Sequence, residues 1–260
     1  MPPMLVDGVR LETERIGGVT PERPTLVFLH DGIGSVRLWR EFPAAVAEAT
    51  GLPALVYSRR GYGDSDPYPG PRPIDYIHRE ARDVLPKVLA SAGIARPILI
   101  GHSDGASIAL IYAGSGSGPV VGLALLAPHV FVEDLTVASI AKAGADYRAN
   151  DVRQRLARYH RDPDASFWGW NDVWLRPEFR TWNIEELLPT IRSPMLVIQG
   201  TDDEYGTPAQ CDAIRRAVSG PCDVLMLENC RHSPHRDQPA ATLDALRRFI
   251  APLSARAVAR

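Results

Sequence analysis

Residues 97–107 read Pro-Ile-Leu-Ile-Gly-His-Ser-Asp-Gly-Ala-Ser. A short apolar run leads here into the pattern Gly-x-Ser-x-Gly, and a segment rich in Ala, Ile and Leu follows it. This order predicts a buried strand, a tight turn at Ser103 and then a helix. Gly101 and Gly105 lack the side chains that would clash in such a turn, so the turn would hold the Ser103 hydroxyl out into solvent. Ser103 is therefore a candidate nucleophile.

The rest of the chain alternates short apolar runs with longer segments of helical spacing. The apolar runs that predict strands are 25–30, 54–58, 97–101, 120–126, 195–200 and 224–227. The segments that predict helices are 38–49, 76–92, 106–113, 210–218 and 242–249. Strands that are apolar on both faces and joined by helices indicate an α/β fold, with a mostly parallel central sheet and helices on both faces. Near the start, Asp7-Gly8 predicts the tight turn of a β-hairpin.

One region breaks the alternation. Residues 129–192 contain no convincing strand, and they hold a helical charge pattern at 151–159 that ends at Asp162-Pro163. We expect this region to be a helical cap, or lid, inserted into a core domain formed by residues 1–128 and 193–260.

The expected cap is rich in aromatic residues, with four of the five tryptophans of the chain. A cap that packs on its core would bury many of these rings for packing alone, and the others would line a pocket. Trp168 and Trp174 are our candidates for contact with a substrate. His129 is a further candidate, because it directly follows the apolar run that ends in Leu-Leu-Ala-Pro.

Composition excludes several classes of protein. The chain has 260 residues, 45% of them apolar and 23% charged, which is typical of a soluble globular protein with one domain or one domain plus an insertion. The formal net charge is −2, so no basic excess favours binding to nucleic acid. The three cysteines show no CxxC or His-interleaved spacing, and neither a disulfide scaffold nor a metal site is expected.

Targeting signals are not evident in the sequence. The N-terminal stretch MPPMLVDGVRLETERIG lacks a basic region followed by an apolar one, which argues against secretion. The most apolar stretch, 120–132, is shorter than the ~20 residues that span a bilayer. We therefore expect a cytoplasmic protein with no membrane partner.

A serine hydroxyl is a poor nucleophile near neutral pH, so Ser103 needs a general base and a group that orients the base. His232 lies in the loop between the last predicted strand and the last helix, and it is the candidate base. His235 is a weaker candidate, because its surroundings resemble the entry to that helix. Three carboxylates, those of Asp202, Asp203 and Glu204, follow the strand 195–200, and spacing alone does not choose among them.

Acyl transfer also requires donors for the oxyanion that develops on the substrate. A turn from strand to helix at Ser103 would aim the backbone N–H of Asp104 at that position. A second donor is expected in the loop 30–35, His-Asp-Gly-Ile-Gly-Ser, where glycine allows close approach of the backbone. Each such donor typically contributes ~10²–10³ in kcat.

Four motifs in this order resemble the α/β-hydrolase superfamily, in particular its small, capped bacterial esterases and lactonases. They are HDGIGS, SRRGYGDSD, GHSDG, and GTDD followed later by RHSPHRDQP. The resemblance covers residues 25–253. It implies the α/β-hydrolase fold, a serine nucleophile and no cofactor. It also assigns the acid to Asp203, three residues after the glycine that ends its strand, and the second oxyanion donor to the N–H of Gly32.

The chain departs from the family pattern at two places. Arg231 precedes the candidate base where the family usually has glycine, so that loop can differ in shape. Asp31 stands where glycine is common and, with Asp104, places a second carboxyl group near the oxyanion site. We expect both side chains to point away from that site, and the arginine of SRRGYG to be structural.

These observations predict a serine hydrolase that cleaves a small carboxylic ester, thioester or lactone with an apolar or aromatic group. Its kcat/KM should rise with pH through one ionisation near ~6.5. The same fold and residues would also suit a hydrolase of C–C bonds in aromatic meta-cleavage products or a 3-oxoadipate enol-lactonase. A different class, a ligand receptor with an intact but slow set of catalytic residues, also remains open.

Overall fold

The computed structural model describes residues 4–255. Seven strands form a central sheet in the order β3-β5-β4-β6-β7-β8-β9. Strand β3 (Thr13–Ile16) runs antiparallel to β5 (Ala54–Tyr57), and every other neighbouring pair is parallel. The remaining strands are β4 (Thr25–Leu29), β6 (Pro97–His102), β7 (Gly122–Leu126), β8 (Met195–Gly200) and β9 (Cys222–Leu227). The predicted α/β class and mostly parallel sheet are confirmed.

A separate two-stranded hairpin precedes this sheet. Strands β1 (Met4–Val6) and β2 (Val9–Leu11) pair antiparallel. Asp7 and Gly8 connect them with φ angles of 49° and 77°. Both angles are positive, as the tight turn expected from the Asp-Gly dipeptide requires.

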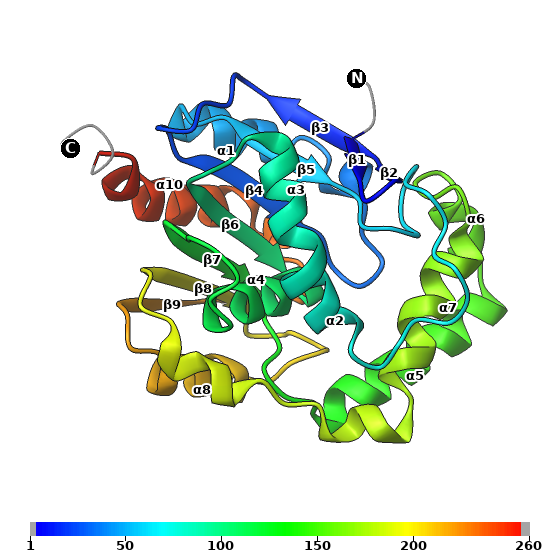
Figure 1. The fold of residues 1–260 in the computed structure, drawn as a ribbon. Coiled ribbons are helices and arrows are strands. Elements are labelled where there is room, and N and C mark those ends of the chain that lie inside the picture. The colour runs from blue at the N-terminus through cyan, green and yellow to red at the C-terminus, as the bar shows by residue number, and fades with distance from the viewer. Residues whose placement is uncertain (1–3, 256–260) are drawn as a thin grey trace.

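Helices cover both faces of the sheet (Figure 1). On one face, α1 (Phe42–Thr50) and α10 (Pro239–Ala255) pack with the strands into one apolar cluster. On the other face, a second cluster contains apolar side chains from α2 (Tyr76–Arg79), α3 (Leu85–Ala92), α4 (Asp104–Gly114) and α8 (Ala209–Ala217). All residues of the central strands β4, β6, β7 and β8 are buried, which explains why their sequences are apolar on both faces.

Prolines and backbone turns modify two of the predicted helices. The segment 76–92 is helical throughout, but it includes a π-helical stretch, η2 (Glu80–Val84), between α2 and α3. Pro86 follows that stretch and has no N–H to donate, so the regular hydrogen-bond ladder cannot continue through it. The segment 38–49 is divided into the 3-10 turn η1 (Val36–Trp39) and α1, because Arg40 between them has a φ of 52°.

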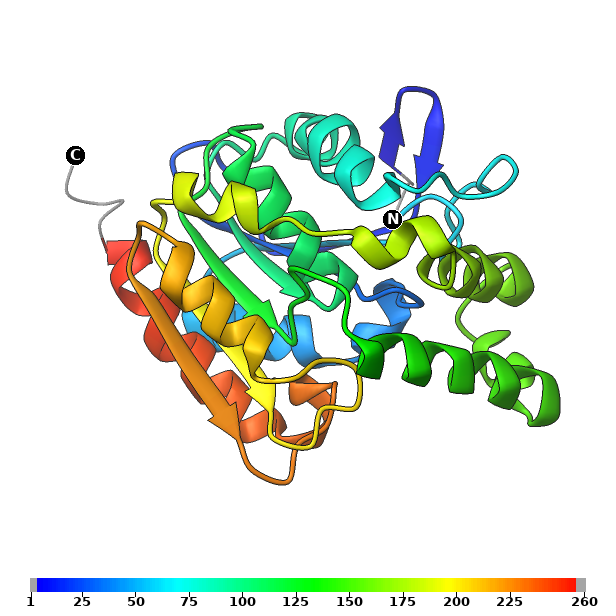
Figure 2. The same cartoon turned by 90° about the horizontal axis from the view of Figure 1, so that it is seen from below.

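Residues 129–192 are helical and contribute no strand to the sheet. Their elements are α5 (Asp134–Ala149), α6 (Val152–Leu156), α7 (Pro163–Trp174) and the 3-10 turns η3 (Pro177–Thr181) and η4 (Glu185–Thr190). Helix α7 begins as its sequence suggests, because the Asp162 carboxylate accepts from the N–H of Ala165 at 2.9 Å and Pro163 opens the helix. Helices α5–α7 lie beyond the carboxyl ends of the strands (Figures 1 and 2). The division of the chain into core and cap stays a prediction.

The carboxyl ends of five neighbouring strands meet at one edge of the sheet, where α5–α7 also lie. The residues that follow these strands therefore come close together although they are far apart in sequence. Residues 30–33 follow β4, Ser103 follows β6, His129 follows β7, Asp203 follows β8 and His232 follows β9. Within residues 4–255, no helix is long and apolar enough to cross a membrane.

Candidate active site

Ser103 occupies the sharp turn between β6 and α4. Its φ of 51° and ψ of −117° lie in a region that non-glycine residues rarely adopt. The turn brings backbone segments so close that a Cβ atom at 101 would lie 2.4 Å from the Gly105 carbonyl oxygen. A Cβ atom at 105 would lie 2.0 Å from the Leu29 carbonyl oxygen. Glycine at both positions is thus a steric requirement of the turn, as the sequence predicts.

The His232 imidazole bridges the serine and a carboxylate. His232 lies in the loop between β9 and α10, and its Nε2 is 2.9 Å from Ser103 Oγ. Its Nδ1 is 2.8 Å from Asp203 Oδ1 and 3.0 Å from Oδ2. Three side chains predicted from separate parts of the sequence therefore form one hydrogen-bonded chain.

Of the three consecutive carboxylates, the structure places that of Asp203 against His232. Asp203 Oδ1 also accepts from the backbone N–H groups of Tyr205 at 2.8 Å and Gly206 at 3.2 Å. Asp202 is exposed. Glu204 turns elsewhere, since its carboxylate accepts from the backbone N–H of His232 at 3.2 Å and pairs with Arg231 at 2.9 Å.

The pairing of His232 with Asp203 sets the pKa of both groups. Burial alone would lower the pKa of His232, but the hydrogen bond from Nδ1 to Asp203 and the negative charge of Asp203 outweigh it and hold that pKa above 6.5. Burial would raise the pKa of Asp203, but the hydrogen bond and charge of His232 keep it below the usual value of 3.8. Near neutral pH the carboxylate is therefore ionised and orients the imidazole.

A cavity of about 190 Å³ lies next to Ser103 and His232. Its walls come from the loops after the strands and from helices α5 and α7. They include Gly32, Ile33, His129, Thr136, Ile140, Trp170, Trp174 and Tyr205. Apolar and aromatic side chains form one part of the walls, and Ser103, His232 and the charged residues Asp31, Glu204 and Arg236 form another.

Gly32 and Asp104 carry the two backbone N–H groups that are predicted to bind the oxyanion. Gly32 lines the cavity, and Asp104 is the first residue of α4. Neither backbone N–H has an acceptor among residues 4–255. Glycine at 32 has a steric cause as well, because a Cβ atom there would lie 2.2 Å from Trp170 Nε1. N–H groups without an acceptor can donate hydrogen bonds to an oxyanion that develops on a substrate at Ser103.

The carboxyl groups of Asp31 and Asp104 lie in different surroundings. That of Asp104 is buried away from the cavity, 3.7 Å from the buried Arg59 guanidinium, and it accepts from the Tyr76 hydroxyl at 2.5 Å. The Tyr76 oxygen in turn accepts from Trp174 Nε1 at 2.9 Å. The Asp31 side chain instead lines the cavity, so the expectation that both point away holds only for Asp104.

Arg59 has a structural position. Its guanidinium donates to the carbonyl oxygens of His30 and Asp31, each at 2.7 Å. It thereby fixes the loop that carries Gly32 and partly neutralises Asp104.

The aromatic predictions require one correction. Trp174 and His129 line the cavity, but Trp168 does not. The Trp168 ring packs on the outer side of the helices against Tyr147 and Phe167, with centroids 5.2 and 5.0 Å away. Trp170, which the sequence analysis did not select, lines the cavity instead.

Helical geometry explains this correction. Successive residues in a helix are rotated by about 100°, so residues two apart face nearly opposite directions and residues four apart share a face. Trp170 and Trp174 are four apart in α7, while Trp168 is on the other side. This spacing would have shown that Trp174 shares a face with Trp170 and not with Trp168, but it does not show which face lines the cavity.

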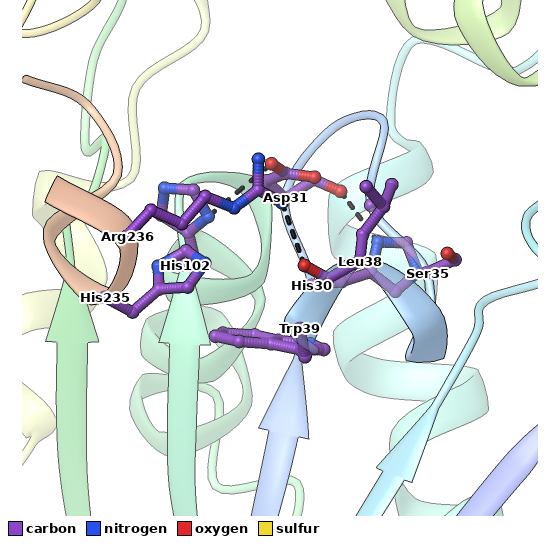
Figure 3. A pocket seen from close by; sticks show the side chains of 9 residues that line it. His30, Asp31, Ser35, Leu38, Trp39, His102, His235 and Arg236 are labelled. Atoms are coloured by element: carbon purple, nitrogen blue, oxygen red, sulfur yellow. Dashed lines mark hydrogen bonds and ion pairs between the residues drawn. The ribbon is translucent and has the colours of Figure 1, made fainter. Parts of the chain in front are cut away.

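Two buried histidines lie beside the site: His102, to which the sequence analysis gave no role, and His235, which it considered as a weaker candidate for the base. His102 Nε2 donates to the carbonyl oxygen of His232 at 2.7 Å, and its Nδ1 lies 3.5 Å from Asp31 Oδ2. The His235 ring is 4.9 Å from that of His102 and 4.8 Å from that of Trp39. Figure 3 shows these rings together, with Trp39 below the two imidazoles at the ends of the strands. They support the His232 loop from beneath.

These supporting histidines are uncharged near neutral pH. Burial lowers the pKa of His102 to about 4 and that of His129 to about 3, and it lowers that of His235 well below 6.5. The only histidine near Ser103 whose pKa is raised is therefore His232, within residues 4–255. The sequence carried a signal for His102, since it precedes Ser103 in the same motif, but motif position does not show which way a side chain turns.

A sequence model of the alpha/beta hydrolase family matches residues 26–245. The chain belongs to the alpha/beta hydrolase family. This confirms the resemblance drawn from the four motifs, and the strand order and helical layers agree with it.

Individual proteins also resemble this chain over most of its length. The 2-succinyl-6-hydroxy-2,4-cyclohexadiene-1-carboxylate synthase of Salmonella paratyphi C is 24% identical over 263 residues, which cover 88% of this chain and 95% of that protein. The proline iminopeptidase of Mycobacterium smegmatis superimposes with a TM-score of 0.74 at 18% identity, covering 98% and 99% of the two chains. The enol-lactonase of Burkholderia xenovorans LB400 gives 0.73 at 22% identity, covering 96% and 99%.

The names of these proteins describe different reactions. At such low sequence identity, their similarity shows the fold of this chain and does not show its reaction. Its chemistry has to be argued from its own site. Among residues 4–255, no group of His, Cys, Asp or Glu side chains is arranged to hold a metal ion.

Proposed function

We propose that this protein is a serine hydrolase that cleaves a small carboxylic ester, thioester or lactone. The observation that carries the proposal is the chain of hydrogen bonds from Ser103 Oγ to His232 Nε2, at 2.9 Å, and from His232 Nδ1 to Asp203, at 2.8 Å. In this arrangement an imidazole can take the serine proton while a carboxylate holds its tautomer and stabilises the imidazolium. No cofactor takes part in the proposed reaction.

The reaction begins when Ser103 Oγ attacks the carbonyl carbon of the substrate and its proton passes to His232 Nε2. The carbonyl oxygen becomes an oxyanion, which accepts from the N–H groups of Gly32 and Asp104. The tetrahedral intermediate then collapses, and the leaving alcohol or thiol takes the proton from Nε2. An acyl group remains on Ser103.

Water completes the cycle. His232 removes a proton from a water molecule as its oxygen attacks the acyl carbon, and a second oxyanion forms between the same two N–H groups. Collapse of this intermediate breaks the bond to Ser103 Oγ, which regains its proton from Nε2. One ester and one water thus give one acid and one alcohol, and the enzyme returns to its starting state.

The cavity supports a small substrate with an apolar or aromatic group. Trp170, Trp174 and Ile140 form apolar walls in a space of about 190 Å³. Two carboxylates, those of Asp31 and Glu204, line the cavity against one guanidinium, that of Arg236, so the excess of negative charge would disfavour a carboxylate on the substrate. The imidazole of His129 is neutral, so it can donate a hydrogen bond to the bound molecule or accept one from it.

Turnover of p-nitrophenyl acetate and butyrate tests the proposal, with Ser103→Ala as the control variant. We expect steady release of p-nitrophenol from the natural protein and a loss of at least about 10³-fold in kcat in the variant. Release of no more than one equivalent, followed by a stall, would support the receptor alternative and reject the enzyme.

The substrate class needs a second measurement. A panel of esters, thioesters, lactones and meta-cleavage products would be assayed at equal concentration by mass spectrometry. We expect the highest kcat/KM among uncharged esters or lactones with a short aromatic or branched group. Hydrolysis of the C–C substrates alone would reject the proposed ester, thioester and lactone class in favour of the C–C hydrolase.

A further inference from the structure

A second cavity, of about 220 Å³, lies on the outer side of helix α7. It is formed by the segment 68–72 and by residues of α7 and its C-terminal end, among them Trp168, Asp172 and Arg176. It shares no lining residue with the cavity at Ser103. The two spaces therefore lie on different sides of the same helix.

The guanidinium of Arg72 is a buried charge at this cavity with no carboxylate of the described residues in ion-pair contact, and at longer range its charge acts on the buried Glu80. Arg72 is only 5% exposed, and it forms no ion pair within residues 4–255. Its two terminal nitrogens both donate to one acceptor, the carbonyl oxygen of Arg60, at 3.4 Å, which is long for a hydrogen bond. Its Nε has no hydrogen-bond partner. Buried charges are normally paired because their desolvation is costly, so this position favours an anion.

The surroundings of Arg72 hold its guanidinium in place. The guanidinium carbon lies 4.2 Å from the ring centre of Tyr62 and 4.8 Å from that of Tyr68. Two glycines leave room for it, since a Cβ atom at 61 would lie 2.8 Å from Nη2 and one at 169 would lie 2.7 Å from Nε. The group is thus positioned by two aromatic rings and two close backbone approaches, and it does not depend on solvent for its orientation.

The cavity offers a second cation and an aromatic wall. Arg176, half-buried, lines it and also forms no ion pair among the described residues. The indole of Trp168 and the ring of Tyr68 supply flat apolar surface, although the guanidinium carbon of Arg148 lies 4.3 Å from the Trp168 ring centre and covers one face of that indole. Asp172 lines the cavity too, but its side chain is exposed, so solvent screens its charge more than that of Arg72.

We infer that this cavity is a binding site for a small ligand that carries a carboxylate or phosphate group on a flat ring. The two guanidinium groups of Arg72 and Arg176 bind the anionic group, and the ring lies against Trp168 and Tyr68. The site is separate from the proposed hydrolysis, so either can be correct without the other.

Calorimetric titration with phenyl phosphate tests the inference directly. Two samples would be titrated, the natural protein and the natural protein whose Ser103 has been blocked by a fluorophosphonate, with the added mass checked by mass spectrometry. The blocked sample distinguishes binding at the cavity of Ser103 from binding at the outer site. We expect saturable binding of phenyl phosphate and benzoate to both samples. Benzyl alcohol, which has the ring but no charge, should bind at least about tenfold more weakly.

Variants of the two arginines identify the site. Arg176→Gln should weaken phenyl phosphate binding by about tenfold or more, and Arg72→Gln should abolish it. Arg155→Gln removes an exposed arginine of α6 that does not line the cavity and should have no effect. Arg72 is buried, so its variant can fail to fold. Arg176 is partly exposed, and the Arg176→Gln variant therefore gives the decisive result.

Three outcomes would overturn the inference. They are the absence of saturable binding, an unchanged affinity in Arg176→Gln, and loss of binding when Ser103 is blocked by the fluorophosphonate. The last result would assign the ligand to the other cavity. Inorganic phosphate that binds as tightly as phenyl phosphate would also reject the proposed contact with the ring.

Discussion

Ser103 has a strained backbone and one side-chain hydrogen-bond partner, His232, whose pKa lies above 6.5. The strain, the close contacts of the two glycines and the neighbouring imidazole are all properties of single residues. Each can be changed alone, and each change has a separate consequence for rate or for stability.

Catalysis should depend on pH through His232. The general base is active when neutral, and the raised pKa of His232 means that more of it is protonated at pH 6.5 than for an ordinary histidine. We expect kcat/KM for p-nitrophenyl butyrate to rise with pH and to level off above an inflection higher than 6.5. This corrects the sequence expectation of ~6.5 upward. His129→Asn should keep the inflection, because the pKa of His129, about 3, is far below this range. A flat profile between pH 5 and 8 would reject His232 as the base.

The turn at Ser103 should not tolerate a methyl group at residue 105. In Gly105→Ala the new Cβ atom would lie 2.0 Å from the Leu29 carbonyl oxygen, so the backbone of β4 or α4 must move. We expect a loss of at least about 2 kcal/mol in the free energy of unfolding, measured by urea denaturation. Gly18→Ala is the matched control, since nothing lies within 4 Å of a Cβ atom there. Equal stability of the two variants would show that the contact is not a constraint.

At the scale of elements, helix α7 lines two separate cavities. Trp170 and Trp174 face the cavity at Ser103, whereas Trp168 lines the outer cavity. The helix therefore separates the proposed site of hydrolysis from the proposed anion site.

A smaller side chain at Trp170, on the face of α7 that lines the cavity at Ser103, should change the preferred length of the acyl chain. Trp170→Ala would enlarge the cavity of about 190 Å³, so we expect kcat/KM to increase for longer acyl chains relative to acetate, by about tenfold or more between acetate and hexanoate esters. Trp168→Ala, the control on the opposite face, should leave the ratio unchanged. Chain-length preference would be measured with p-nitrophenyl esters from two to eight carbons. A shift in the Trp168 variant and none in the Trp170 variant would contradict the assignment of the faces.

The elements were largely predictable from sequence, and their orientations were not. The period of apolar residues predicted each strand of the parallel sheet and the helices between them, because burial on both faces leaves a clear pattern. The pattern could not show that Trp170 faces Ser103 or that His102 supports His232. Those contacts depend on helix rotation and on rings from distant segments, which one sequence does not record.

The same limit applied to the acid. Asp202, Asp203 and Glu204 are equivalent by spacing after β8, and only the path of the loop brings Asp203 to His232. The family resemblance indicated Asp203, the residue that contacts His232, because it carries information about loop shape that composition and period lack. Asp31 shows the opposite case, because the sequence analysis expected its carboxyl group to point away from the oxyanion site, whereas Asp31 lines the cavity.

At the scale of the whole molecule, buried histidines link stability to pH. Six of the seven histidines have a lowered pKa; those of His102 and His160 are about 4, and that of His129 is about 3. Burial is the main cause in each case. The unfolded chain binds protons at these residues near pH 6.5, whereas the folded protein does not. Their contribution to stability is thus complete above pH 6.5 and is lost as the pH falls toward their folded pKa values.

The molecule should therefore be acid-labile. Near pH 5, His102, His129 and His160 together would lower the free energy of unfolding by on the order of 4 kcal/mol per pH unit, because the unfolded state binds about three more protons. Urea denaturation at pH 7, 6 and 5 measures this slope. His232 has a raised pKa, so it adds stability as the pH falls from its folded pKa to about 6.5 and contributes nothing to the slope near pH 5, where it is protonated in both states. Stability that stays constant from pH 7 to 5 would show that these histidines are not buried uncharged.

The hydrogen bonds from Trp174 to Tyr76 and from Tyr76 to Asp104 connect helix α7 with the residue that directly follows the proposed nucleophile. A wall of the cavity is thereby connected to the turn at Ser103, and both are in place without a bound ligand. Such preorganisation means that little conformational entropy is lost when the substrate binds. The affinity of a ligand should then depend chiefly on how well its shape matches a rigid space, and an ill-fitting ligand gains nothing from induced fit.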